Sequence, residues 1–529
     1  MDNAQEQRRR YPVGIQTFSK IRQGNYVYVD KTALVYRLAN ESDGAFFLSR
    51  PRRFGKSLLV STLQAYFEGR RDLFSGLKIE KLESTWERYP VIRLDLSTVK
   101  TRDPEILLDL LDAALSFEEA QWGRDNSMKT PGSRLMGLIR RACAQTGKPV
   151  VVLVDEYDAP LLNVVDDPQR LPVFQDVMRE FFAPLKACDE YLRFVFITGI
   201  TKFAQLSIFS ELNNLTNISM QPEYAAICGI TEEELVTQLS QDVDELSGML
   251  GIDRAGTLGA LKRQYDGYHF CDPSPDIYNP YSLLGAFRDS KIGDYWFATG
   301  TPTFLVDLLK KQEWDISTLE SCQAREEEFD VPAQRMRTPL PMLYQGGYLT
   351  IKGYDALTHT FTLGIPNEEV SRGLSKSLVE HASPDALREH YSFLDAFSAD
   401  LRAGNIDHAL KGMRAYLAGI PYHLGSRDER GFQTKFYLIF DLLGIQIETE
   451  FKTATGRIDA VVKTDGIVYV MEVKYNKTPG EALAQIDAKD YALPFSADGR
   501  QLVKVGVNFS EREQTIDGWI VEVETVGTP

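Results

Sequence analysis

Between residues 44 and 200, short apolar runs alternate with amphipathic stretches, and this alternation limits the fold more than any other feature. Phe46–Leu48, Val150–Val154 and Phe194–Ile197 are β-branched or aromatic runs of strand length. The stretch from Leu59 to Phe67 instead carries apolar residues at helical spacing. Strands buried on both faces and alternating with helices are typical of a mostly parallel sheet covered by helices. The sequence therefore predicts an α/β domain.

The first strand is followed directly by RPRRFGKS, residues 50–57, and then by a helix. Such a loop can bind phosphate, because helix N-terminal N–H groups point at the ligand and Gly55 allows a close approach. Lys56 would reach the β- and γ-phosphates and Ser57 the Mg²⁺, with Arg53 and Phe54 completing the predicted loop. The usual spacing places a first glycine where this chain has Arg50, so the motif is degenerate. The loop's four cations could alternatively hold nucleic acid, although a triphosphate explains them more simply.

Two further strand ends add polar groups to the predicted nucleotide site. Val150–Val154 ends in Asp155 and Glu156, at the carboxyl edge where ligands sit in open α/β sheets. Asp155 would hold the Mg²⁺ water shell and Glu156 would act as general base. Thr198 and Thr201 end the next strand and would sense the γ-phosphate. The alternative is that GKS only caps a helix and that the two acids only close a strand. Nucleotide binding is predicted more firmly than hydrolysis.

The rest of the chain divides by pattern. We expect a core at 1–230, a mainly helical lid at 231–350, a mostly helical connector at 351–424 and a small α+β domain at 425–529. Thr231 and Glu234 predict the capped start of the first lid helix. Four strand-like runs and one helix are expected within 446–524.

The C-terminal domain contains GRIDAVVKTDGIVYVMEVK, residues 456–474, whose geometry follows from its turn. Asp465-Gly466 predicts a two-residue hairpin loop. That register places Asp459 directly opposite Glu472, with Cβ atoms about 4.5–5.5 Å apart, and Lys474 on the same face. Opposed carboxylates need a compensating cation, and their oxygens suit Mg²⁺ or Mn²⁺. The hairpin therefore predicts a metal site for phosphodiester hydrolysis. The alternative is a solvated hairpin whose acids are neutralised by Lys474 or Arg457.

Helical residues around this hairpin can complete the site. Gln485 and Lys489 share a helix face at a spacing of one turn. Glu429 opens the preceding predicted helix and could add a third carboxylate, although a helix-opening glutamate also favours the helix dipole.

Composition excludes several classes of protein. The net charge is −16, with +7 in residues 1–100 and therefore −23 in the remainder, which argues against a general DNA-coating protein. The five cysteines and six histidines form no zinc motif, and the cysteines fit a reducing cytoplasm. The expectation is a chain with no secretory signal and no membrane span.

Longer motifs reveal a family resemblance. The chain resembles bacterial proteins with an N-terminal AAA-ATPase-like domain and a C-terminal PD-(D/E)XK nuclease-superfamily domain, on motifs spread over most of its length. They are YVDKT (28–32), LSRPRRFGKSLL (48–59), VVLVDEYDAP (151–160), FITGITKF (196–203), SIFSELNNLTNIS (207–219), YDGYHF (265–270), YNPYSLL (278–284), TGTPTFL (299–305), GRID, EVK and AQIDAKDYA (484–492).

The resemblance implies a P-loop ATPase core with a helical lid, followed by an αβββαβ nuclease core. It implies ATPase roles for Lys56, Ser57, Asp155 and Glu156. The nuclease motif positions fall on Glu429, Asp459, Glu472, Lys474 and Gln485, and Tyr491 is matched as a packing residue. Within the helix from 429, Gln433-Thr434 departs from the residues usual in relatives.

Three functions are compatible with the two predicted sites. The leading one is an ATP-gated, Mg²⁺-dependent nuclease acting on nucleic acid, with DNA favoured over RNA. The second is a nucleotide-dependent switch or scaffold whose nuclease fold only binds nucleic acid or protein, which the net charge of −5 over residues 425–529 favours. The third is an ATPase motor with a relic nuclease site. A homo-oligomer is possible because AAA-like sites are often completed across subunits. The sequence identifies no arginine finger, and Arg193 is a candidate only because it lies on the strand that ends in Thr198.

Overall fold

A computed structural model describes residues 9–40, 44–201, 215–296, 319, 321–325, 328, 338–380, 386–419, 446–453, 456–496, 499–513 and 515–524. The chain forms two compact units. The first comprises Met1–Gly300 with Ser321–Glu369, and the second comprises Thr301–Glu320 with Val370–Pro529.

The first unit is built on a five-stranded sheet in the order β2-β3-β4-β1-β5, and every neighbouring pair is parallel. This confirms the α/β fold predicted from the alternating pattern. The strands are β1 (Gly44–Ser49), β2 (Val91–Asp95), β3 (Val150–Asp155), β4 (Leu192–Gly199) and β5 (Leu215–Asn217). All six residues of β3 are buried, as expected for a strand with helices on both faces.

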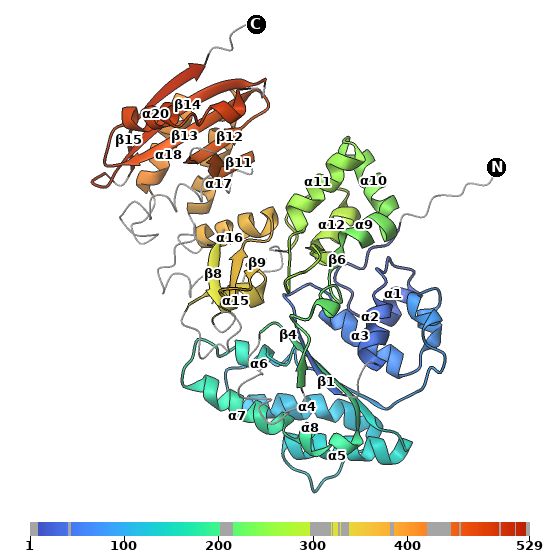
Figure 1. Cartoon of the computed structure of the whole chain (residues 1–529). Helices are drawn as coiled ribbons and strands as arrows, with labels where there is room; N and C mark the ends of the chain where they lie inside the picture. Colours follow the sequence, from blue (N-terminus) through green and yellow to red (C-terminus); the bar gives the residue numbers. More distant parts are fainter. Residues whose placement is uncertain are drawn as a thin grey trace, which may run out of the picture. The chain divides into compact units, whose positions relative to one another are not determined.

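Helices cover both faces of this sheet (Figure 1). On one face lies α3 (Lys56–Phe67), whose Phe67 ring lies 5.0 Å from that of Phe194 on β4. On the other, Val152 packs in a cluster with Leu111, Leu138 and Phe174, which come from three long helices. These are α4 (Pro104–Trp122), α5 (Pro131–Thr146) and α7 (Arg170–Phe182). The remaining short elements are α1 (Phe18–Gln23), α2 (Thr32–Asn40), α6 (Ala159–Leu162), α8 (Pro184–Ala187), η1 (Arg71–Phe74), η2 (Lys78–Lys81), η3 (Asp189–Tyr191) and η5 (Pro222–Tyr224).

A helical subdomain follows the sheet, and we call it the lid. Thr231 and Glu234 form the expected capping box at its first helix, since each side chain accepts the other's backbone N–H. Its elements are β6 (Ile230–Thr231), α9 (Glu232–Gln238), α10 (Ser240–Leu250), α11 (Arg254–Tyr265), β7 (Ile277–Tyr278) and α12 (Pro280–Asp289).

No helix among the described residues is both long and apolar enough to cross a membrane.

The region expected to be a mostly helical connector begins instead with sheet. An antiparallel sheet in the order β8-β10-β9 lies in the first unit, together with a short helix. These elements are β8 (Cys322–Arg325), α15 (Leu340–Gly346), β9 (Thr350–Asp355) and β10 (Thr360–Gly364). The sequence stretch 350–364 is rich in threonine and aromatic residues, which favour strands. The boundary between units falls at Glu369, inside helix α16 (Glu368–Glu380).

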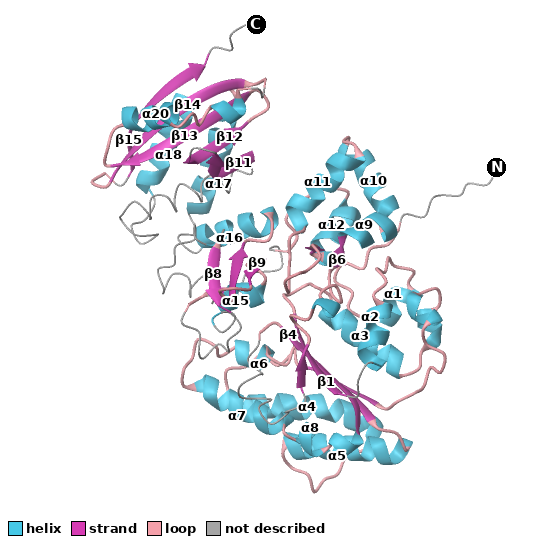
Figure 2. Ribbon diagram, viewed as in Figure 1, coloured by secondary structure: helices cyan, strands magenta, loops and turns pink. Residues whose placement is uncertain are grey.

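The second unit is a five-stranded sheet in the order β11-β12-β13-β14-β15, antiparallel except where β13 pairs with β14 (Figure 2). It has one strand more than the sequence predicts. Its elements are α17 (Ala386–Arg402), α18 (Ile406–Gly419), β11 (Gln446–Thr453), β12 (Gly456–Lys463), β13 (Ile467–Tyr475), α20 (Pro479–Ala488), η9 (Leu493–Phe495), β14 (Gln501–Ser510) and β15 (Thr515–Glu524).

Alternate residues of β13 enter different cores. Tyr469 and Met471 pack with residues of α17 and α18, whereas Val468 and Val470 pack with Leu483 and Ile486 of α20. The helices at 386–419 therefore supply part of the core of this sheet. Because side chains alternate along a strand, Glu472 continues the α20 face.

Candidate nucleotide cleft and metal centre

A cleft of about 790 Å³ opens at the carboxyl edge of the parallel sheet. Its walls come from residues 50–57, which we call the phosphate loop, from the ends of β2 and β3, from the N-terminal segment and from the lid. Its lining includes Pro12–Gln16, Arg52, Arg53, Gly55, Lys56, Ser57, Ser97, Thr98, Lys100, Glu156, Asp158, Ile200, Pro280, Tyr281 and Leu284. This is the edge at which open α/β sheets bind ligands.

The phosphate loop joins β1 to α3, as predicted. Gly55 caps α3 with φ +94°, a conformation that glycine adopts without strain. Lys56 is buried, and its Nζ donates to the carbonyl oxygens of Arg50 and Pro51, both at 2.9 Å. Burial lowers the pKa of Lys56, and the charges of Glu156 and Asp155 oppose that shift. The loop thus wraps around its own lysine, next to two acids.

Two residues of the loop face inward rather than into the cleft. The Arg50 guanidinium donates to the carbonyl of Ser219 at 2.8 Å and lies 4.1 Å above the ring of Phe270. The interpretation of Arg50 as one of four triphosphate-binding cations is therefore wrong. The buried Phe54 ring packs against Tyr268, at 4.8 Å, so only its backbone is available to a ligand.

The predicted acids lie where β3 ends. Asp155 is 1% exposed, and burial raises its pKa, while a hydrogen bond from Ser57 and the charge of Lys56 oppose that shift. Burial also raises the pKa of Glu156, which lines the cleft. Asp155 Oδ1 and Thr198 Oγ1 are both buried without a hydrogen-bond partner. Unpartnered oxygens of this kind fit a site for Mg²⁺ and a phosphate group.

Thr201 does not take the sensor position. Its N–H and its hydroxyl donate to Asp158 Oδ2 at 2.7 Å and 2.6 Å, and the N–H of Ile200 donates to the same oxygen at 3.0 Å. Asp158 therefore joins the end of β4 to the segment after β3, a role that the sequence analysis missed. The signal was a third acid in VDEYD.

Arg193 and Lys100 lie at opposite ends of the sheet's strands. Arg193 lies at the start of β4, the end away from the cleft, where it donates to the carbonyl of Ala39 at 3.1 Å. It therefore cannot serve the cleft of its own chain. Lys100, on the loop after β2, lines the cleft instead. A single loop lysine has no spacing that sequence analysis could have recognised.

In the second unit the predicted hairpin register is confirmed. Ala460 pairs with Met471 and Lys463 with Val468, while Thr464 N–H donates to Ile467 at 2.8 Å across the turn. The register runs from the turn to Ala460 and Met471, and the next residues, Asp459 and Glu472, alternate onto the sheet face that α20 covers.

Four predicted residues meet there. Lys474 Nζ lies 2.9 Å from Glu472 Oε1, and Gln485 donates to the same oxygen. Asp459 Oδ2 accepts the N–H of Val473 at 2.8 Å. Glu472 is 2% exposed, and burial, with the charge of Asp459 adding to it, raises its pKa to about 7. Its Oε2 is buried without a hydrogen-bond partner. An unpartnered carboxylate oxygen beside a second acid fits a hard divalent cation.

The remaining nuclease predictions differ in outcome. Glu429 and Gln433-Thr434 lie outside the described residues. Lys489 directly follows α20 and is exposed, so its contribution stays a prediction. Tyr491 is 2% exposed in a cluster with Val461 and Ile486, which confirms its packing role.

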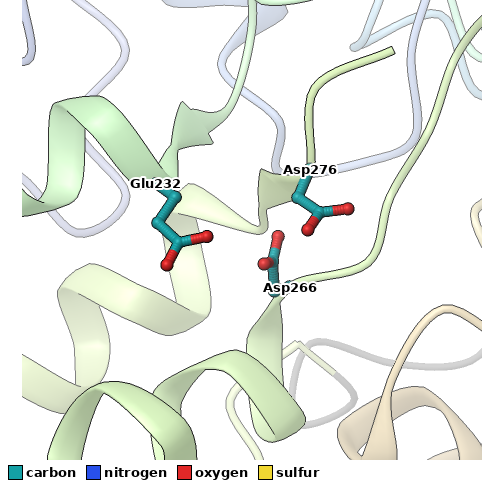
Figure 3. Close-up of side chains that lie close together, drawn as sticks. All are labelled: Glu232, Asp266 and Asp276. Carbon is teal, nitrogen blue, oxygen red and sulfur yellow. The ribbon is translucent and has the colours of Figure 1, made fainter. Parts of the chain in front are cut away.

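The sequence analysis also missed a group of acids in the lid (Figure 3). Glu232, Asp266 and Asp276 converge from α9, the end of α11 and the segment before β7. Lys262 Nζ lies 3.0 Å from both Glu232 and Asp276 and 3.9 Å from Asp266. His269 Nε2 lies 2.6 Å from Asp276. The group thus contains a cation from its own chain, and it ties these lid segments together.

Comparison with known proteins agrees with the two folds. Residues 12–209 match the family described as predicted AAA-ATPase, and residues 427–519 match the PD-(D/E)XK nuclease superfamily. The class defined by fold and site is therefore an AAA-ATPase-like unit joined to a nuclease-superfamily unit. An uncharacterised protein from the region 5′ of vnfD in Azotobacter chroococcum is 34% identical over 528 residues, covering 97% of this chain and 99% of the relative. The chain belongs to this family of AAA-ATPase-like proteins with a C-terminal PD-(D/E)XK domain.

Proposed function

We propose that the protein is a nuclease that uses Mg²⁺ or Mn²⁺, hydrolyses phosphodiester bonds of nucleic acid and is controlled by ATP at the cleft of the first unit. The observation that carries this proposal is the buried Glu472, whose Oε2 lacks a hydrogen-bond partner and whose pKa is raised by burial and by the nearby charge of Asp459. Two facing acids are costly in a sheet unless a cation compensates them. Lys474 contacts Oε1, so the second oxygen is left for a metal ion.

Each residue around Asp459 and Glu472, which we call the carboxylate pair, then has a distinct task. Asp459 and Glu472 would hold the cation, which when bound polarises the phosphodiester and lowers the pKa of a water molecule. Lys474 would orient that water or take its proton. Gln485 fixes the Glu472 carboxylate by donating to it.

The cleft would bind ATP through Lys56, Ser57 and the polar groups at the ends of β3 and β4. Lys56 Nζ is held by two backbone carbonyls and can exchange them for phosphate oxygens. Ser57 and Asp155 would hold Mg²⁺, which would neutralise negative charge on the phosphates. Glu156 lines the cleft and would act as general base, and Thr198 would contact the γ-phosphate.

A switch or scaffold is the second candidate, because residues 425–529 carry 12 basic against 17 acidic residues. Surfaces that cut DNA are usually more basic. Such a protein would respond to ATP and bind its partner without cutting nucleic acid.

The deciding experiment is a cleavage assay on DNA and RNA, single- and double-stranded, with Mg²⁺ or Mn²⁺ and with or without ATP. It compares the wild type with Asp459→Ala and Lys56→Ala. We expect cleavage to be lost in the first variant and its response to ATP to be lost in the second. Wild-type cleavage with no ATP response would refute the control by ATP. Nucleotide binding with no cleavage of any substrate would favour the switch. If the protein also hydrolysed ATP and Glu472→Ala left that activity unchanged, a motor would be favoured instead.

A further inference from the structure

The phosphate loop rests on the motif YDGYHF, residues 265–270, for which the proposed function gives no role. The ring of Phe54 lies 4.8 Å from that of Tyr268 and 5.4 Å from that of Phe270. Arg50 stacks on the other partner, 4.1 Å above Phe270. All three aromatic side chains are buried. Because packed interiors have few voids, a shift of the loop must be accommodated by this motif.

The same motif holds the chain that leads to the second unit. Asn367 Nδ2 donates to the carbonyl of Asp266 at 2.7 Å, and both residues are buried. Gly267 has φ +86°, and a Cβ at that position would lie 2.3 Å from the carbonyl oxygen of Pro366. Only glycine permits this close approach. The YDGYHF motif therefore lies between the phosphate loop and residues 366–367.

A second connection runs through Trp296. Its indole Nε1 donates to the carbonyl of Arg52 in the phosphate loop at 3.2 Å. Its backbone N–H and that of Tyr295 donate to Glu369 Oε1 at 2.7 Å and 2.5 Å. Glu369 is 1% exposed, and burial raises its pKa to about 7. Its carboxylate thus fixes Trp296, and Trp296 fixes the loop.

Glu369 occupies a special place in the chain. It is the last residue of the first unit and the second residue of α16, which continues from Val370 into the second unit. Both connections from the phosphate loop therefore end within four residues, 366–369, at the start of one helix. Shifts of helices are among the known elements of allosteric transitions.

We propose that residues 366–369, held by YDGYHF and by Trp296, form the link through which nucleotide at the phosphate loop controls the nuclease unit. This inference rests on the proposed function. Nucleotide would draw Lys56 Nζ away from the carbonyls of Arg50 and Pro51. Arg50 itself stacks on Phe270, and Arg52, which follows Pro51, accepts the indole N–H of Trp296. Trp296 and Glu369 are positioning residues and touch no reacting atom. Packed side chains and hydrogen bonds of this kind can carry coupling between two distant sites.

The test is hydrogen exchange of the full chain with and without ATP and Mg²⁺, followed in peptides covering 50–60 and 366–380. Trp296→Phe removes the indole N–H and keeps an aromatic ring. Trp519→Phe is the matched control, because its indole also donates one hydrogen bond, to Asp407 at 2.8 Å in the second unit. In the wild type and the control we expect ATP to slow exchange in both peptides. In Trp296→Phe the connection through YDGYHF remains, so we expect full slowing at 50–60 but reduced slowing at 366–380, with ATP affinity changed by about tenfold at most, the effect of one hydrogen bond.

A second variant makes the result independent of the tryptophan. Glu369→Ala removes the acceptor of both backbone N–H groups, so ATP stimulation of cleavage should fall while cleavage by metal alone persists. Unchanged ATP effects on 366–380 and on cleavage in both variants would overturn the link. An ATP response at 50–60 but not at 366–380 in the wild type would also overturn it. No ATP response at 50–60 in the wild type would instead refute the proposed ATP binding, and the link with it.

Discussion

The nucleotide cleft and the carboxylate pair use similar groups but assemble them differently. Each combines a lysine with two acids and leaves a carboxylate oxygen without a hydrogen-bond partner, Asp155 Oδ1 at the end of β3 and Glu472 Oε2 in the pair. The cleft draws its groups from the ends of several parallel strands, the lid and the N-terminal segment. The pair comes from one hairpin and one helix. The pair is therefore fixed by local register, whereas the cleft depends on tertiary structure.

The two lysines differ in the same sense. Lys56 is held by neutral carbonyls, whereas Lys474 already faces the charged Glu472. A ligand that brings negative charge can draw Lys56 out of its loop at small cost. Lys474 is instead fixed beside its carboxylate and suits a permanent metal site. This contrast predicts a switchable cleft and a static pair.

The largest effect should come from removing one member of the pair. Asp459→Asn should reduce metal-dependent cleavage by about a thousandfold, because a lost metal ligand costs several kcal/mol in the transition state. Nucleotide affinity should stay unchanged. Asp465→Asn is the matched control, since Asp465 is exposed in the turn of the same hairpin and Asn-Gly forms that turn equally well. Equal cleavage by both variants, measured as initial rates at saturating Mn²⁺, would show that the pair is structural.

The complementary change acts on the cleft. Lys56→Ala should weaken ATP binding by about a hundredfold, the effect of losing charged hydrogen bonds to phosphate. Cleavage by metal alone should persist. Lys186→Ala, an exposed lysine of the same unit, serves as control. Calorimetric titration with ATP and Mg²⁺ decides, and similar affinities for the two variants would contradict the assignment of the loop.

The contrast between the sites also explains how much could be predicted from sequence. The hairpin register followed from Asp465-Gly466 alone, because the turn fixes which residues oppose each other. The parallel sheet followed from three apolar strands. Whether Glu429 joins the pair stays a prediction, since it lies outside the described residues.

What could not be predicted depends on contacts between distant segments. Arg50 turns inward because its guanidinium donates to the carbonyl of Ser219 and stacks on the ring of Phe270. Thr201 bonds to Asp158 instead of facing the cleft. Nor does any local pattern connect Trp296 with Glu369. Buried polar groups need partners, but a sequence does not say which partner will be near.

A smaller effect should appear as a dependence on pH. Burial raises the pKa of Glu472 from 4.5 to about 7, so below that pH the metal-free carboxyl is protonated. A metal ion must then displace a proton, and Mn²⁺ affinity should rise about tenfold per pH unit up to pH ~7 and then level off. Fluorescence or magnetic resonance titration with Mn²⁺ at several pH values measures this. An affinity independent of pH between 5.5 and 7.5 (roughly one unit either side of the transition) would contradict it.

The same shift affects stability with a defined sign. Between pH 4.5 and about 7 the folded chain keeps a proton on Glu472 that the unfolded chain has lost, so stability falls as pH rises through this window. Glu472→Gln should remove up to ~3 kcal/mol of that decline. Glu118→Gln is the control, because burial also raises the pKa of Glu118 to about 7. Both variants should flatten the denaturation profile with pH, but Glu118→Gln should leave the Mn²⁺ response intact.

The smallest effect concerns the helix that supports the pair. Gln485→Ala removes the amide that donates to Glu472 Oε1, and groups that orient metal ligands typically contribute about tenfold to activity or affinity. Cleavage and Mn²⁺ affinity should both fall by about that factor. Asp487→Asn, on the same helix but paired with Lys504 at 2.8 Å, should change neither. If Gln485→Ala lowered cleavage without lowering Mn²⁺ affinity, Gln485 would act on the nucleic acid rather than on Glu472. In that case the pair would be less static than the contrast with the cleft implies.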